Sequence, residues 1–401
     1  MMDRHLLYVT AFLRAVTTSL VGVLLGVYLA KNGITGVAFG AIISAGLLGA
    51  ASAAVAATFF GDRIGRRRFL LVLTAASALG TIAFAFSSSP LALCTAAFFG
   101  MLNGMGKDRG AALILEQAAL PGLAPETERT RAIAWYTMLQ DLGHGAGAAL
   151  AGLAPVLGGS ARLRGADPHR ILLLGCAGLA LATLLAYARL GRTLDASSSL
   201  GARGVTRESR AILTRISALF ALDALGGGFL TAAMLSYFFF ERFGASEAAI
   251  GGLFAAARIM NAFSHLGAAW LARRIGLVKT MVFTHLPSSL LLMTVAIAPN
   301  FQVAALLFLL REGLVEMDVP TRQSYVLAVV RPEERTFASG ITNLVRLTAW
   351  AIAPLVAGAL ASGDNLHVPL IAGAAMKIAY DLLLWRAFRA VRPPEERVAP
   401  A

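Results

Sequence analysis

Ionisable residues inside long apolar stretches are the first candidates for chemistry in this sequence of 401 residues. A charged side chain at the centre of a bilayer costs about 2.5–3.5 kcal/mol on insertion scales, so such residues face a water-filled cavity or one another. They could bind the polar parts of a substrate or carry a coupling proton, or they could form permanent structural ion pairs. The seven deepest candidates are Arg14, Asp141, Asp223, Arg258, Arg311, Glu312 and Arg346.

The segments around these residues are too apolar for a soluble protein. Apolar residues make up 57% of the chain and charged residues 14%, whereas soluble domains carry about 25% charged residues. The stretches 37–60 and 69–106 contain no charged residue. A run of about 18 apolar residues spans a bilayer as a helix, because hydrocarbon leaves the backbone groups no partners but one another. The composition therefore predicts an all-α membrane protein that crosses the bilayer many times.

Turn signals and charges divide the chain into twelve expected spans. At about 1.5 Å per residue, the seven candidates lie about 12–18 Å from the ends of their spans, near the middle of a hydrocarbon core of about 30 Å. Both cysteines, Cys94 and Cys176, lie in apolar segments, so we expect no metal site and no cofactor. The expected spans are 6–30, 34–60, 69–88, 91–120, 131–157, 170–190, 212–241, 246–271, 278–298, 301–328, 335–361 and 366–388.

The basic residues indicate the orientation. Most of the 35 lysines and arginines lie in the termini, in the loops after even-numbered spans, or at the edges of the spans that these loops join. Because cytoplasmic loops carry the excess of Lys and Arg, both termini are predicted to be cytoplasmic, in a multi-pass protein of the inner (plasma) membrane. The net charge of +13 is then a topology signal, and we expect no nucleic-acid partner. The N-terminal apolar segment has no cleavage site and is interpreted as the first span.

The chain also repeats itself. Gly40 and Gly251 lie 211 positions apart, and Gly152 and Gly358 lie 206 apart, within matching sequence blocks. The first and seventh spans both start on the inside, so the halves are parallel repeats related by an axis along the membrane normal. The Gly-, Ser- and Arg-rich segment in the middle of the chain reads as a linker. The predicted division is a six-helix bundle over 1–190, a cytoplasmic linker over 191–211 and a second bundle over 212–401.

Two of the deep charges are equivalent under this repeat. Arg14 and Asp223 lie 209 positions apart, at the same depth of the first and seventh spans. Opposite charges at symmetry-related positions near a central axis could form an ion pair between the halves. The favoured hypothesis places both residues in the substrate or proton pathway, and a permanent structural ion pair is the alternative.

The loop after the second span resembles the signature of the major facilitator superfamily, Gly-x-x-x-Asp-(Arg/Lys)-x-Gly-(Arg/Lys)-(Arg/Lys). The chain reads "TFFGDRIGRR", with Thr58 in place of the first glycine. The corresponding loop of the second half, "LARRIGLVK", has Arg273 in place of the acid. This resemblance implies two six-helix bundles around a central cavity, and transport by alternating access between them.

The same loop contains candidate residues for a cytoplasmic gate. Gly65 permits a tight turn. The resemblance implies that Asp62, with Arg66, contacts the eleventh span and holds the cytoplasmic side shut, whereas Arg67 and Arg68 are interpreted as topology signals. The loops "ETERTRA" and "PEERTFA" lie on the same side and could supply charge partners between the halves or be solvated. Their candidate gate residues are Glu128, Arg129, Glu334 and Arg335.

Other polar residues in the spans favour structural roles. Asp108 and Glu116 lie lower in the fourth span, and Asp318 and Arg322 lie lower in the tenth, as inner-gate or interfacial charges. Lys377 and Asp381 are four residues apart and are predicted to pair on one helix face. The segment "GHGAGAALAG" brings small residues onto one face and predicts close helix contact.

These observations predict a secondary active transporter for a small organic solute, monomeric in the lipid bilayer and coupled to protons. We favour export over import because the sequence has no nutrient-permease signature. The excess of deep arginines suits an anionic solute, so an importer or facilitator of such a solute is the alternative. A transport-inactive membrane sensor of the same fold is a second one. Catalytic and nucleotide-binding motifs are absent from the sequence, which argues against an enzyme and an ATP-driven pump.

Overall fold

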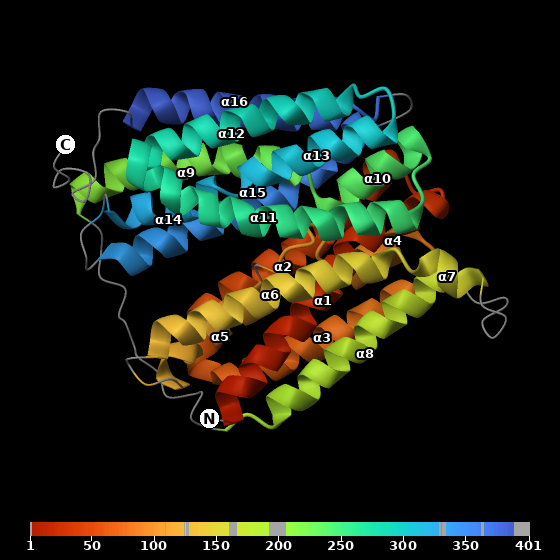
Figure 1. Ribbon diagram of the computed structural model, residues 1–401. Helices are drawn as coiled ribbons and strands as arrows, with labels where there is room; N and C mark the ends of the chain where they lie inside the picture. Colours follow the sequence, from red (N-terminus) through yellow and green to blue (C-terminus); the bar gives the residue numbers. More distant parts are fainter. Residues whose placement is uncertain are drawn as a thin grey trace. The chain divides into compact units, whose positions relative to one another are not determined.

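The computed structural model describes residues 2–108, 110–123, 125, 128–159, 167–191, 206–328, 330, 334–361 and 365–388, and every regular element in these ranges is a helix (Figure 1). Each expected span is formed by one helix or by two consecutive helices, which confirms the all-α prediction. The single helices are α1 (Met2–Lys31), α2 (Gly36–Ile64), α3 (Arg66–Phe86), α8 (Pro168–Ala188), α11 (Glu247–Ile275), α12 (Leu277–Ala296), α15 (Arg335–Leu360) and α16 (Val368–Phe388).

Four spans are divided. The divided spans are α4 (Pro90–Gly100) with α5 (Ala111–Ala119), α6 (Arg129–Ala151) with α7 (Ala154–Gly159), α9 (Arg207–Gly228) with α10 (Ala232–Phe243), and α13 (Phe301–Val315) with α14 (Asp318–Ala328). A short 3₁₀ helix, η1 (Leu120–Leu123), follows α5. Within the described residues, eight segments are long and apolar enough to cross a membrane. The chain is therefore an integral membrane protein.

The fourth span differs from the continuous helix expected over 91–120. Helix α4 ends at Gly100, and Met101 takes the left-handed conformation with φ 52°. The irregular segment that follows is held by Asn103, whose side chain donates to the carbonyl of Lys107 and accepts from the amide of Met105. Irregular backbone at membrane depth is stable only where protein or a polar cavity surrounds it. This break therefore marks the polar interior described below.

The helices group into two compact units. Unit 1 comprises 1–199, 231–255 and 354–362, and unit 2 comprises 200–230, 256–353 and 363–401. Unit 1 thus takes in α10, the first turns of α11 and the end of α15. The predicted division into bundles over 1–190 and 212–401 stays a prediction.

In unit 1, close packing of α1 on α6 depends on glycine. A Cβ atom on Gly147 would lie 2.2 Å from the carbonyl oxygen of Val16, and one on Gly143 would lie 2.6 Å from that of Phe12. Backbone atoms cannot move aside as a side-chain tip can, so these positions require glycine. The predicted small-residue face is confirmed.

The glycines that define the sequence repeat also meet in unit 1. Gly358 packs on Gly40, where a Cβ would lie 2.7 Å from the Cα of Gly40, and Gly251 packs on Gly152, with a corresponding distance of 2.8 Å to Cα. The two contacts are equivalent under the repeat, because Gly40 corresponds to Gly251 and Gly358 corresponds to Gly152. Each contact joins a residue of one half to a residue of the other. The repeated glycines are thus explained by two symmetry-related helix contacts.

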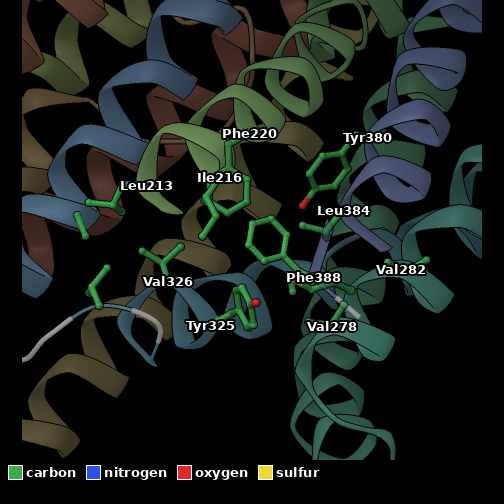
Figure 2. Close-up of a cluster of buried hydrophobic side chains, with 13 residues drawn as sticks. Leu213, Ile216, Phe220, Val278, Val282, Tyr325, Val326, Tyr380, Leu384 and Phe388 are labelled. Atoms are coloured by element: carbon green, nitrogen blue, oxygen red, sulfur yellow. The ribbon is translucent and has the colours of Figure 1, made fainter. Parts of the chain in front are cut away.

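Unit 2 has an apolar core between α9, α12, α14 and α16. Figure 2 shows Phe220 and Ile216 of α9 facing Phe388 of α16, with Tyr325 of α14 beside them. Tyr325 and Phe388 pack edge to face with ring centroids 5.7 Å apart. This core holds together four helices that carry buried charges of unit 2.

Candidate functional site

Arg14 of α1 is the centre of a buried polar cluster in unit 1. Its Nε donates to Oδ2 of Asp108 at 2.9 Å, and its Nη1 lies 2.7 Å from Oε2 of Glu116. The guanidinium also donates to the hydroxyl oxygens of Tyr187, at 2.7 Å, and Tyr136, at 3.3 Å. Five donors in a planar fork suit Arg to such a set of partners. The cluster joins α1, α5, α6, α8 and the irregular segment.

The two carboxylates of this cluster are themselves well partnered. Glu116 is fully buried and accepts hydrogen bonds from the hydroxyls of Thr10 and Tyr136, both at 2.6 Å. The amide of Asp108 donates to Nε2 of His144 at 3.0 Å. His144 therefore accepts at Nε2, and its proton sits on Nδ1. A buried charge network is stable when every member has partners, which favours an anchoring role for Arg14.

A cavity of about 110 Å³ lies beside the Arg14 cluster. This volume is enough for several water molecules. The lining is mixed, with hydroxyl, amide and charged groups among small apolar residues. Its polar lining residues are Arg14, Thr17, Thr18, Thr74, Ser77, Asn103, Asp108 and Thr183.

Asp223 of α9 is the centre of the corresponding cluster in unit 2. Lys377 of α16 donates to its Oδ1 at 2.7 Å, and Arg322 of α14 donates to its Oδ2 at 3.0 Å. Arg346 of α15 lies 3.9 Å from Oδ2. Arg322 also pairs with Asp318 at 2.8 Å. One carboxylate is thus surrounded by cations from three helices.

The two clusters are related by the repeat with their charges exchanged. Arg14 and Asp223 are equivalent at 209 positions, and their partners Glu116 and Arg322 are 206 apart. The alternative of an ion pair between Arg14 and Asp223 is wrong, because each residue has its partners within its own unit. Sequence spacing found the equivalent positions but not the partners, which come from other helices.

Span 12 also pairs differently from the prediction. Lys377 contacts Asp223, whereas Asp381 accepts from Nδ1 of His285 on α12 at 3.0 Å. The predicted pair of Lys377 with Asp381 is therefore replaced by two contacts to other helices. Sequence reasoning did not single out His285, although it lies in an apolar stretch of α12. The depth argument applied to Asp and Arg finds it as well.

The remaining deep residues differ in exposure. Arg311 and Glu312 of α13 are buried and paired with each other, and Asn261 of α11 donates to Oε2 of Glu312 at 2.8 Å. Asp141 of α6 is exposed, and Arg258 of α11 is half-buried. Arg346 lies over the ring of Trp350, 4.6 Å from its centroid.

The turn at the signature loop has the predicted form. Gly65 has φ 97° between α2 and α3, and the repeat-equivalent Gly276 has φ 88° between α11 and α12. Arg66 is buried and donates to the carbonyl of Ala118 at 3.2 Å. Arg67 donates to the carbonyl of Ala188 at 2.6 Å, at the end of α8. Cations at helix C-termini stabilise the free carbonyls, so Arg67 has a structural contact beyond a topology signal.

The other predicted gate residues are placed only in part. Glu128 accepts from Arg4 at 2.8 Å, and this hydrogen bond lowers the pKa of the Glu128 carboxyl. Glu334 accepts from the amide of Thr206 at 2.7 Å, and Arg129 is the exposed first residue of α6. Each hydrogen bond lies inside one unit, so charge pairing between the halves stays a prediction. The side chains of Asp62 and Arg335 lie outside the described residues.

Sequence reasoning missed a second charged contact in unit 1, at the helix ends opposite the signature loop. Glu247, the first residue of α11, pairs with Lys31 at the end of α1, and its Oε2 lies 3.0 Å from Nε2 of His169 on α8. Nδ1 of His169 lies 3.1 Å from Asp167. Lys31, His169 and Glu247 each lie within one residue of the end of an expected span, so in the sequence each has the position of an ordinary loop charge. The contact appears only when the helices are packed.

The twelve spans, the repeated glycine contacts and the two buried charge clusters define a polytopic helical membrane protein with an internal repeat. The sequence matches the family model of the Major Facilitator Superfamily over residues 7–311 and 216–401. The chain belongs to this superfamily of transporters.

Relatives of known structure share this fold at low sequence identity. The nucleoside transporter NupG has a TM-score of 0.76 at 13% identity, covering 97% of this chain and 100% of that one. A D-xylose-proton symporter has a TM-score of 0.75 at 15% identity, with 96% and 97% coverage. A bacterial homologue of the human lysosomal transporter Spinster has a TM-score of 0.73 at 15% identity, with 99% and 98% coverage.

A yeast protein is similar over nearly the whole chain. The uncharacterized membrane protein YJR124C of Saccharomyces cerevisiae is 24% identical over 416 residues, covering 95% of this chain and 93% of its own. The similarity to it and to the solved structures extends to the full length of the fold, and it leaves the substrate open.

Proposed function

We propose that the protein is a secondary active transporter that moves a small organic solute across the cytoplasmic membrane by alternating access, with protons as the coupling ion. Membership of the superfamily supports the transport function. The repeat-related glycine contacts support a mechanism in which two bundles move against each other, because close contacts without interlocking side chains can separate. Both termini and the signature loop face the cytoplasm in this proposal.

One observation carries the assignment of the solute pathway. Asp141 is exposed at mid-depth of the fifth span. Facing lipid, such a carboxylate would cost about 2.5–3.5 kcal/mol, so it faces water. We assign Asp141, Arg258 and Arg346 to the wall of the aqueous pathway. Asp223, Arg311 and Glu312 are buried in ion pairs, and Arg14 is a partly buried member of another ion pair, which favours a role for all four in positioning the helices.

The proposal is tested by solute flux in proteoliposomes, across a panel of nucleosides, sugars, carboxylates and amphiphilic cations, with and without an imposed pH gradient. We expect one class to accumulate against its gradient when the pH gradient is present. Asp141→Asn should weaken the apparent affinity for this class, and Glu241→Gln, at an exposed position near the end of α10, serves as the control. Absence of flux for every class would contradict transport and favour a sensor of the same fold.

The direction of transport is a separate part of the proposal. We favour export, because the sequence has no nutrient-permease signature. Uptake by inside-out vesicles driven by an acidic interior would support export, whereas uptake by right-side-out vesicles would support import. An anionic solute remains the alternative, supported by the arginines at positions 258 and 346.

A further inference from the structure

His285 lies in the middle of the buried charge network of unit 2. It is 1% exposed on α12, and its Nδ1 lies 3.0 Å from both carboxylate oxygens of Asp381 on α16. Its Nε2 lies 3.4 Å from Nζ of Lys377 and 3.7 Å from Oδ1 of Asp223. Histidine is the side chain whose ordinary titration falls near neutral pH. A histidine held between two carboxylates and an ammonium group has its proton positions determined by these partners.

The hydrogen-bond roles of the ring follow from the chemistry of its neighbours. An ionised carboxylate only accepts, so Nδ1 of His285 carries a proton and donates to Asp381. An ammonium group only donates, so Nε2 accepts from Lys377 and carries no proton. The geometry therefore describes a neutral imidazole with one unprotonated basic nitrogen. That nitrogen faces Asp223, the central carboxylate of the cluster.

The charges around His285 balance when the imidazole is neutral. The carboxylates are Asp223, Asp318 and Asp381, and the cations are Arg322, Arg346 and Lys377, from α9, α14, α15 and α16. Helix α13 also packs on α12, and its pair Arg311 and Glu312 is neutral in sum. The ring of Tyr380 meets the imidazole edge to face at 5.9 Å. Among the described residues, this network is therefore neutral in sum, and one added proton would give it a net positive charge.

We propose that Nε2 of His285 binds the coupling proton, an inference that rests on the proton-coupled transport proposed above. The proton forms an N–H bond with the lone pair of Nε2, and the hydrogen bond from Lys377 to this nitrogen breaks. The new N–H turns to Oδ1 of Asp223, and Lys377 loses an acceptor beside a new cation. Because Asp223, His285 and Lys377 lie on α9, α12 and α16, protonation changes how three helices are held together.

The decisive variant is His285→Gln, which keeps an amide near the position of Nε2 but has no group that titrates near neutral pH. Its matched control is His367→Gln, at a half-buried histidine that directly precedes α16 and belongs to neither charge cluster described above. We expect His285→Gln to lose at least tenfold of pH-gradient-driven accumulation and to keep solute exchange without a gradient. The control keeps both activities. Unchanged driven accumulation in His285→Gln would overturn the assignment.

A transport-independent measurement separates this site from the proposed function. Proton uptake by the purified protein is followed with a pH indicator between about pH 8 and about pH 5, where histidine titrates. We expect the wild type to bind one proton per molecule more than His285→Gln. Equal uptake would overturn the proton site, whatever the transport result. One extra proton in a protein that shows no driven transport would support the site and refute proton-coupled transport.

Discussion

At the scale of residues, the charged side chains at mid-depth pair with residues of their own unit. Arg14 is held by Asp108 and Glu116, and Asp223 is held by Lys377 and Arg322. Removing one partner of a buried ion pair leaves an uncompensated charge, which costs about 3–5 kcal/mol. Substitution of these residues should therefore lower the stability of the protein, and a loss of transport should follow from that loss of stability.

Arg14→Ala leaves two buried carboxylates without their cation, and we expect the free energy of unfolding in detergent to fall by about 3–5 kcal/mol. Arg68→Ala, at an exposed position of the signature loop, should leave it nearly unchanged. The measurement is thermal or denaturant unfolding of the purified protein. Equal stability of the two variants would contradict the anchoring role.

Exchanging the residues at positions 14 and 223 should not restore the stability that each single substitution removes. Each exchanged residue would meet charges of its own sign, since aspartate would join Asp108 and Glu116, and arginine would join Arg322 and Lys377. The double variant should thus be no more stable than the single variants in an expression and size-exclusion assay. Recovery by the exchange would contradict the two separate clusters.

The contact of Glu128 with Arg4 has a predictable pH dependence. The hydrogen bond from Arg4 lowers the pKa of Glu128 below the ordinary value, which is about 4.3 for glutamate. The stability that the contact contributes is therefore present above about pH 4.3 and is lost as the pH falls through the lowered pKa. The melting temperatures of wild type and Glu128→Gln should differ by a small constant amount near neutral pH and converge in acid. Divergence on acidification would contradict this sign.

At the scale of elements, glycine sets how closely the helices approach. The carbonyl of Val16 lies where a side chain on Gly147 would begin, whereas nothing lies within 4 Å of a Cβ on Gly178 of α8. Glycine costs a helix about 1 kcal/mol relative to alanine, so Gly147 is retained for its contact and Gly178 has no such contact in the described residues.

Gly147→Ala should therefore destabilise the protein, and Gly178→Ala should leave its stability equal or slightly raised. The first change forces α1 and α6 apart, and the second adds helix propensity in open space. Melting temperatures of the two variants in one detergent check the prediction. A stabilised Gly147→Ala variant would show that α1 and α6 are packed less closely.

At the scale of the whole molecule, the parts of unit 1 that come from the second half show how the halves are held at one end. α10, the start of α11 and the end of α15 pack with α1, α2 and α6 through glycine contacts and through Glu247. The distribution of Lys and Arg predicts that these helix ends lie on the non-cytoplasmic side of the membrane. A transporter that alternates must release these contacts to open this side.

Glu247→Gln should favour opening of this side, because it weakens the contacts to Lys31 and His169. In a background with Cys94 and Cys176 replaced by serine, Ser236→Cys reports the change, since Ser236 is fully buried beside Gly26. Labelling by a membrane-impermeant thiol reagent should rise severalfold in Glu247→Gln and stay unchanged in Glu241→Gln. Equal labelling would contradict the role of Glu247 in closure.

The sequence by itself determined the class of protein, the twelve spans, the repeat and the family resemblance. These follow from local causes, since apolar run length, turn residues such as Gly65 and repeated glycines act on a helix regardless of its neighbours. The depths of Arg14 and Asp223 were also predictable, because depth is a count along one helix.

Only the tertiary structure decided which charges meet. In the structure, Arg14 pairs with Glu116 and Asp223 pairs with Lys377. His285 belongs to the network around Asp223, and the fourth span is interrupted at Met101. A buried charge is satisfied by whichever helix packs beside it, and neighbours in space are set by the packing of many helices at once. The spacing of residues along the sequence therefore does not predict which charged residues pair.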